Sequence, residues 1–184
     1  MTSLTPRPAR RWLMVAVLAA ATLVACGAAT PSPTVAPRPT FDQRSVHAYP
    51  GLEERLPAAI AGRAMLRTSY GPAEDAADDA LGGALAGEGR DPRLLELATA
   101  SPSDDLQDLL LVAYRYPGLA GADLLSMLVA LAPAGGATPS EMGGKSVTVL
   151  EDPEGSAWAY ARDDVLYVIA GDGPAAEAAI AALP

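Results

Sequence analysis

The chain has 184 residues, of which 50% are hydrophobic and 19% are charged, and its formal net charge is −9. The length and composition exclude a wholly disordered chain and allow one domain with its own hydrophobic core. The negative net charge makes nucleic acid an unfavourable partner, because its phosphates repel an acidic surface. The single cysteine and the single histidine exclude an intrachain disulfide and any metal site built from several such residues, so we expect no cofactor and no metal.

The first predicted element is a secretory leader. Residues 1–11 contain three arginines and no acid, and residues 12–25 form an apolar run of 14 residues that only Thr22 interrupts. This order is typical of a signal peptide. The run is shorter than the roughly 20 apolar residues of a spanning helix, although extension through residues 27–29 leaves an uncleaved anchor as an alternative. Arg10-Arg11 also looks like a twin-arginine signal, so both export routes stay open.

The leader closes with the motif Leu23-Val24-Ala25-Cys26. This motif resembles the lipobox of bacterial lipoprotein precursors, in which leucine stands three residues before a cysteine and a small residue stands directly before it. The resemblance covers residues 1–27. It implies that Cys26 receives a diacylglyceryl group, that a peptidase removes residues 1–25, and that the acylated cysteine anchors the protein to membrane lipid. The implied location is the extracytoplasmic side of the cell membrane or of the outer membrane.

The segment after the cysteine predicts an extended linker. Residues 27–43 contain four prolines with interleaved Thr, Ser and Ala, and such segments favour polyproline-like geometry at about 3.1 Å per residue. We therefore expect three parts: a signal peptide at 1–25, a lipidated cysteine with its linker at 26–45, and one α+β domain at 46–184. Three of the 13 basic residues lie in the leader, so 10 basic and 22 acidic residues remain, a balance of −12.

Strand and helix patterns begin soon after the linker. Residues 64–70 predict a strand, and residues 74–85 predict an acidic helix. Residues 94–100 and 109–116 predict the two strands of a hairpin, because residues 101–105 form a turn-rich cluster between them.

The second half of the domain predicts further strands and two helices. A broad leucine stripe at residues 122–131 predicts the clearest helix, and residues 133–144 predict a Gly/Pro loop. Three strands and a closing helix follow, at residues 146–150, 157–161, 165–170 and 174–183. Short connections favour antiparallel pairing. The predicted fold class is α+β, a two-layer sandwich of a mainly antiparallel sheet of about six strands with three helices.

Three polar features resemble binding sites, and we interpret them as solvated segments. Residues 143–146 (Gly-Gly-Lys-Ser) look like the end of a phosphate-binding loop, but Pro139 replaces the first glycine of that motif and a strand follows instead of a helix. His47 lies at the edge of the linker and is interpreted as exposed. Six carboxylates lack the alternating spacing of a calcium loop; they are Glu151, Asp152, Glu154, Asp163, Asp164 and Asp172.

The candidate ligand-binding residues are Trp158 and Tyr160. Alternation along a strand puts both rings on one face, opposite three alanines at positions 157, 159 and 161. If the alanine face meets the helices, the two rings line an open face of the sheet and bind an apolar ligand or a sugar ring. The alternative interpretation places both rings in the core or in a buried interface.

The sequence favours a membrane-tethered lipoprotein whose extracytoplasmic domain binds a small molecule or an envelope protein without catalysing a reaction. A nucleophilic serine in a G-x-S-x-G motif does not occur, and the domain core offers no histidine for a catalytic triad. One alternative function is a hydrolase of envelope polymers that uses paired carboxylates. Another is an accessory subunit of an envelope complex.

Overall fold

The computed structural model describes residues 47–70, 80–103, 109–152 and 155–184. The predicted leader, the lipobox with Cys26, the linker and the first half (74–79) of the helix predicted at 74–85 lie outside the described residues. Within the described ranges, no helix is both long enough and apolar enough to cross a membrane.

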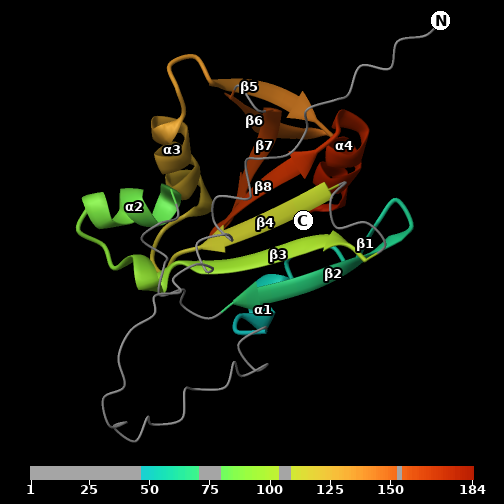
Figure 1. Ribbon diagram of the computed structural model, residues 1–184, viewed down its shortest axis with the longest axis horizontal. Coiled ribbons are helices and arrows are strands. Elements are labelled where there is room, and N and C mark those ends of the chain that lie inside the picture. Colours follow the sequence, from blue (N-terminus) through green and yellow to red (C-terminus); the bar gives the residue numbers. More distant parts are fainter. Residues whose placement is uncertain (1–46, 71–79, 104–108, 153–154) are drawn as a thin grey trace, which may run out of the picture.

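Eight strands form one antiparallel sheet in the described parts of the chain (Figure 1). The order across the sheet is β1-β2-β3-β4-β8-β7-β6-β5, so two four-stranded meanders meet where β4 pairs with β8. The strands are β1 (Ala59–Ile60), β2 (Arg63–Tyr70), β3 (Glu96–Pro102), β4 (Leu109–Arg115), β5 (Ala137–Met142), β6 (Lys145–Asp152), β7 (Gly155–Arg162) and β8 (Val165–Gly171).

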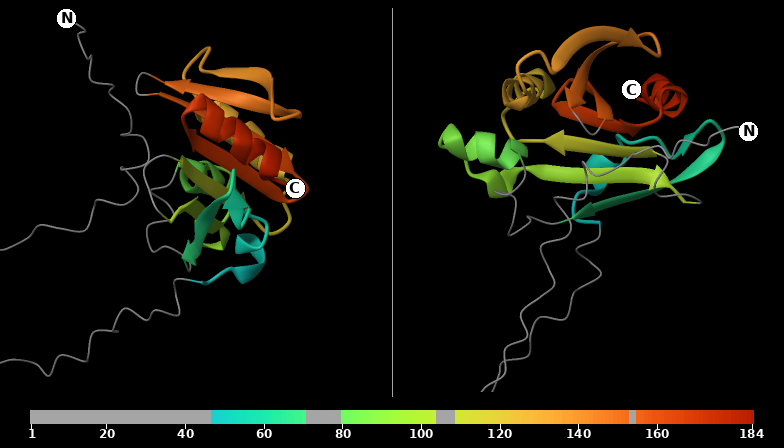
Figure 2. Two further views of the ribbon diagram at one scale, coloured as in Figure 1. Left: turned by 90° about the vertical axis from the view of Figure 1, so that its right-hand side faces the viewer. Right: turned by 45° about the horizontal axis from the view of Figure 1, so that its top comes forward.

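In the same described ranges, four α-helices cover both faces of this sheet (Figure 2). Helices α1 (Pro50–Glu53) and α4 (Gly173–Ala182) pack on one face, and helices α2 (Ala80–Gly87) and α3 (Gly121–Leu131) pack on the other. Strand β8 shows the division, because Tyr167 lies in the core cluster with α1 and α4 whereas its neighbour Leu166 lies in the cluster with α2 and α3. Burial on both faces explains why β4 and β8 are almost continuously apolar.

The predicted α+β class with an antiparallel sheet is confirmed, but its finer details are imprecise. The described residues form eight strands and four α-helices, with a 3₁₀ turn η2 (Pro92–Leu94), where about six strands and three helices were expected. The helices also lie on both faces of the sheet instead of one. The pairing of β4 with β8, which joins the two meanders, is a long-range contact that local sequence patterns do not report.

Most predicted elements have a counterpart in the structure. The predicted strand 64–70 is β2, the last three predicted strands are β6, β7 and β8, and the two leucine- and alanine-rich helices are α3 and α4. The predicted hairpin is confirmed as β3 and β4, although β3 is shifted by two residues and takes in Ser101 and Pro102 of the predicted turn.

The loop predicted at 133–144 is wrong, because residues 137–142 form the edge strand β5. Strand β5 pairs only with β6, and an edge strand tolerates Pro139 because the side of the strand that faces solvent needs no backbone donor. The side chains of residues 138–141 are exposed, so the segment has no apolar alternation. Helix α1 and strand β1 were not predicted either, because both are too short to show a period.

Candidate functional site

A groove of about 310 Å³ lies at one end of the sheet, between the β1–β2 hairpin and helix α4. Hairpin and helix lie side by side at the right of Figure 1 and again in the left view of Figure 2. The lining residues come from the β1–β2 hairpin, from strands β3 and β4 and from α4 with its cap; they are Ile60, Ala61, Arg63, Met65, Pro102, Leu109, Asp172, Pro174, Ala175 and Ala178.

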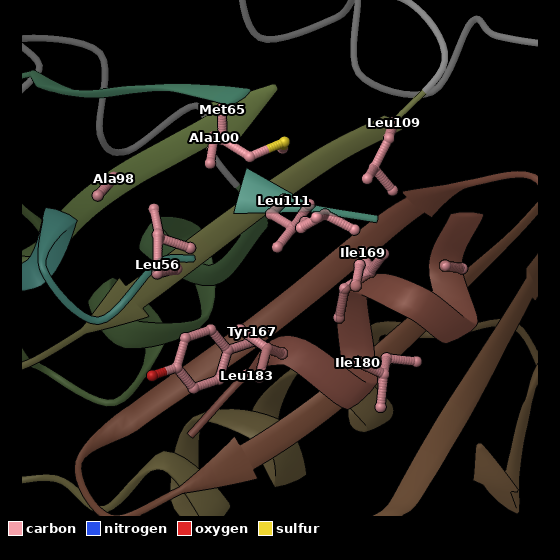
Figure 3. Packing of buried hydrophobic residues seen from close by; sticks show 14 of the residues in the cluster. Leu56, Met65, Ala98, Ala100, Leu109, Leu111, Tyr167, Ile169, Ile180 and Leu183 are labelled. Carbon is pink, nitrogen blue, oxygen red and sulfur yellow. The ribbon is translucent and has the colours of Figure 1, made fainter. Parts of the chain in front are cut away.

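The floor of the groove is a part of the hydrophobic core. Ile60, Met65 and Leu109 are each less than a tenth exposed, and all three belong to the cluster that packs under α1 and α4. Figure 3 shows Met65 and Leu109 within that cluster, on β2 and β4. The groove therefore lies directly above the hydrophobic core, and the side chains of its floor are themselves almost fully buried.

Helix α4 forms one wall. Its N-terminus is capped by Asp172, whose carboxylate accepts a hydrogen bond from the Ala175 backbone N–H at 2.8 Å, and Pro174 occupies the first turn. Ala175 and Ala178 lie three residues apart, so both face the groove. Because the side chain of alanine is a single methyl group, these two residues project little into the groove.

The β1–β2 hairpin forms the opposite wall. Its two turn residues both have positive φ, +49° at Ala61 and +80° at Gly62. A residue with a side chain loses about 1–2 kcal/mol in this left-handed conformation, which glycine or asparagine adopts more readily. Strained residues of this kind persist where the surrounding structure holds them, often beside ligand sites. The methyl group of Ala61 and the half-buried Arg63 line the groove at this wall.

The groove offers an apolar surface with a charged rim. Among the described residues that line it, the only charged side chains are Arg63 and Asp172, and no aromatic ring is present. Such a site gains binding energy from displaced water over an aliphatic floor and orients a ligand through a few polar groups.

The structure places Trp158 and Tyr160 away from this groove. Both rings lie on the α4 face of β7, half-buried against the core cluster, while Ala159 on the other face is buried in the cluster with α3. Both faces of β7 therefore meet helices, and the open aromatic face that alternation suggested is not formed. Tyr160 stacks on Tyr167 with ring centroids 6.0 Å apart, and its hydroxyl donates to the Pro184 carbonyl at 3.2 Å.

The Gly-Gly-Lys-Ser segment is confirmed as a turn that enters a strand. Gly143 and Gly144 have φ of +57° and +75° and connect β5 to β6. The ammonium group of Lys145 donates to the carbonyls of Ile180 at 2.9 Å and Leu183 at 2.7 Å, at the end of α4. This lysine therefore stabilises the C-terminus of a helix, which attracts a positive charge.

His47 belongs to a structural contact at the start of the domain. Its Nδ1 lies 3.0 Å from the Glu53 carboxylate, and the buried Ser69 hydroxyl donates to the same carboxylate at 2.5 Å. A catalytic serine needs the imidazole beside its own hydroxyl, with the carboxylate behind the imidazole. Here the carboxylate lies between serine and histidine, so this arrangement lacks the order that activates a nucleophile.

The acidic residues near strand ends fall into separate groups: Glu151 and Asp152 end β6, Asp163 and Asp164 share the β7–β8 turn, and Asp172 precedes α4. Asp163 has a φ of +54° in the β7–β8 turn, Asp164 lies 3.9 Å from Arg115, and Asp172 caps α4. Glu154 and the side chain of Asp152 lie outside the described residues. In the described ranges, no group of three or more His, Cys, Asp or Glu side chains is arranged to hold a metal.

Sequence reasoning missed the groove because none of its lining residues carries a signal of its own. The nearest local signal is the Ala61-Gly62 pair, which is a weaker hairpin signal than Asn-Gly. Comparison of the chain with family models, with curated proteins and with solved structures finds no match.

Proposed function

We propose that this protein is a lipid-anchored extracytoplasmic binding protein, and that the groove between the β1–β2 hairpin and α4 holds a small apolar ligand. The resemblance of residues 23–26 to a lipobox supports the anchor. The proline-rich segment at residues 27–43 is long enough to let the domain stand up to roughly 50 Å from the bilayer.

The apolar lining of the groove carries the proposal. Ile60, Met65 and Leu109 close its floor and are already buried, so the apolar surface that a ligand would remove from water belongs mainly to the wall residues Ala61, Pro174 and Ala178. Ligand sites typically have volumes of about 300–1,000 Å³. The volume of this groove, about 310 Å³, fits a small ligand. Among the described lining residues, Arg63 and Asp172 are the charged ones, and Asp172 also caps α4.

Filling the groove tests the proposal. We expect Ala178→Phe to place a ring over the floor and to weaken binding of the uncharged fluorescent probe N-phenyl-1-naphthylamine by about tenfold or more, equivalent to about 1.4 kcal/mol. Ala182→Phe is the matched control, because Ala182 lies on the same helix, is exposed and does not line the groove. Equal probe binding by both variants, with equal thermal midpoints, would reject the groove as the ligand site.

The anchor has a separate test. Mass spectrometry of the protein from its native membrane should find an acyl mass on Cys26 and no peptide from residues 1–25. An intact peptide that runs from Arg11 through Cys26 in the mature protein would contradict lipidation. This result bears on the anchor alone and leaves the groove test unaffected.

A further inference from the structure

We propose that one uncharged face of strands β2 and β3 lies against the bilayer that holds the lipid anchor. This inference rests on the proposed function, because the acylated Cys26 supplies that bilayer. The face lies on the side of the sheet opposite to the groove, so the two surfaces can be tested independently.

Alternation along β2 and β3 puts all their charged side chains on one side of the sheet. Met65 and Ala98 belong to the core cluster with α1, and the charged residues of the two strands follow the same alternation; they are Arg63, Arg67 and Glu96. Arg67, for example, donates to the Leu56 carbonyl at 3.3 Å. The opposite face of these two strands has no charged side chain; its residues are Ala64, Leu66, Thr68, Tyr70, Leu97, Thr99 and Ser101.

No described helix covers this uncharged face. Helix α3 packs on β4, β7 and β8, α2 packs on α3, and none of the seven residues belongs to either core cluster. Leu66 is 52% exposed and Tyr70 is 47% exposed, while Thr68 and Thr99 between them share a hydrogen bond at 2.9 Å. In Figure 1 helix α1 lies behind β2 and β3, so this face is turned toward the viewer. An exposed apolar face without charges indicates a surface that binds a partner.

The tether, residues 27–46, indicates which partner that is. The described chain begins at His47, which pairs with Ser69 of β2, directly before Tyr70. The tether leads from this point to the proposed anchor on Cys26 and would span up to roughly 60 Å if fully extended. A domain on such a tether meets the bilayer at an effective concentration on the order of millimolar, so a weak contact is sufficient.

The side chains of the face fit the boundary between headgroups and acyl chains. Tyrosine favours this boundary, because its ring is apolar and its hydroxyl is polar, and leucine gains from contact with hydrocarbon. No charged side chain of the face has to leave water. Four acids at residues 74–79 follow Tyr70 in the sequence, and the chain after the leader is strongly acidic. Anionic headgroups therefore repel the domain, and the lipid that it contacts is zwitterionic.

A fluorescent label on the face tests the contact. The protein is the full chain purified from its native membrane and reconstituted into phosphatidylcholine vesicles that contain a nitroxide lipid. Cys26 is the only cysteine and its thiol is occupied by the anchor, so an added cysteine is the only free thiol. The label is placed by Ala64→Cys, at an exposed position of this face, or by Ala182→Cys, at an exposed position of α4 across the sheet. We expect the nitroxide to quench the label at residue 64 and not the label at residue 182.

Two double variants make the outcome specific. Leu66→Ser with Tyr70→Ser should lower the ratio of docked to undocked domains by about tenfold, because both apolar contacts are lost. Val129→Ser with Leu131→Ser is the matched control, since it removes two exposed apolar side chains from α3 and should leave the quenching unchanged. Urea midpoints of unfolding check that both double variants keep the fold.

Each remaining outcome decides against the proposal. Equal quenching at both label sites, or quenching that survives Leu66→Ser with Tyr70→Ser, would overturn it. A label at residue 64 that shifts to the blue with protein density but is not quenched would replace the bilayer by a second copy of the chain. Stronger quenching after addition of anionic phosphatidylglycerol would show that charge holds the domain instead of this face. If Cys26 carries an acyl group and residue 64 is not quenched, the inference fails and the anchor stands. If Cys26 carries no acyl group, both fail.

Discussion

The hydroxyl of Ser69 donates a hydrogen bond to the Glu53 carboxylate at 2.5 Å, and this contact joins strand β2 to helix α1. Both residues are buried, and His47 lies 3.0 Å from the same carboxylate. A buried carboxylate needs such partners because an uncompensated buried charge is costly. The Ser69 hydroxyl also accepts a hydrogen bond from the Tyr49 backbone N–H at 2.7 Å. The Ser69 side chain therefore adds to the backbone hydrogen bond from Ala48 to the Ser69 carbonyl in holding the first described residues on the sheet.

Ser69→Ala should destabilise the domain by about 1–3 kcal/mol, because it leaves the Tyr49 N–H without this partner and leaves His47 as the remaining contact of the buried Glu53 carboxylate. The measurement is the free energy of unfolding in urea. Ser126→Ala is the control, since Ser126 is exposed and its hydroxyl donates only to the Ala122 carbonyl of its own helix at 2.9 Å. A loss that is no larger for Ser69→Ala than for Ser126→Ala would contradict the structural role of this contact.

Alanine substitutions at the two glycines of the β5–β6 turn should separate the effect of a close packing contact on stability from the effect of backbone strain. Gly143 and Gly144 both have positive φ, but a Cβ at Gly143 would lie 2.8 Å from the Ala181 amide nitrogen, whereas a Cβ at Gly144 would meet open space. Gly144→Ala should therefore cost about 1–2 kcal/mol from strain. Gly143→Ala should cost clearly more, because α4 must also move. Equal unfolding free energies for the two variants would show that the turn does not pack against α4.

Local sequence patterns predicted the helices that bury one clear apolar stripe and the strands that consist of one apolar run. Leucines of α3 and the apolar residues of β4 and β8 give strong periodic signals, and these elements are confirmed. Strand β5 gives none, because its position at the sheet edge leaves the side chains of residues 138–141 exposed. Its strand conformation follows from pairing with β6 across the Gly143-Gly144 turn, which a single segment does not reveal.

The candidate site depends even more on long-range contacts. Met65, Leu109 and Ala178 line one groove, although more than a hundred residues separate the first from the last. Each would be read from the sequence as an ordinary core or helix residue. Trp158 and Tyr160 were predicted as ligand-binding residues because aromatic side chains often line ligand sites. Both pack against the core cluster that includes residues of α4, a contact that the local pattern of β7 does not reveal.

Trp158→Ala should destabilise the fold and leave groove binding unchanged. Trp158 packs against the core cluster and pairs with Ile169 across the β7–β8 ladder, so removal of its ring leaves a cavity. We expect a loss of about 2–4 kcal/mol, somewhat below that of a fully buried tryptophan. Leu131→Ala, at an exposed position of α3, should change stability by about 0.5 kcal/mol or less. Loss of naphthyl-probe binding in still-folded Trp158→Ala would instead place Trp158 at the ligand site.

Tyr167 should make the domain sensitive to alkaline pH. Burial raises the pKa of its phenol from 10.0 to about 12. Between these values the unfolded chain has lost this proton and the folded chain keeps it, so stability that is present below pH 10 falls as the pH rises toward 12. We expect a loss of about 1–2 kcal/mol from this group, given 1.36 kcal/mol per unit and some solvent screening.

The urea midpoint of unfolding, measured in steps from pH 9 to pH 11.5, checks the Tyr167 prediction. Tyr167→Phe keeps the ring in the core and removes the titrating group, so its stability should fall less steeply above pH 10. A decline of equal slope in both proteins would assign the alkaline loss to other groups.

Ala61 lines the groove and has a strained backbone conformation. Its φ of +49° costs about 1–2 kcal/mol for a residue with a side chain. Glycine avoids this cost but adds about 0.5–1 kcal/mol of chain entropy on folding, so Ala61→Gly should raise the free energy of unfolding by up to about 1 kcal/mol. Ala64→Gly is the matched control on β2, where the backbone is extended, and it should lower stability by about 0.5–1 kcal/mol. Urea unfolding of the two variants should therefore give changes of opposite sign. Equal losses in both would show that the hairpin turn at the groove carries no strain.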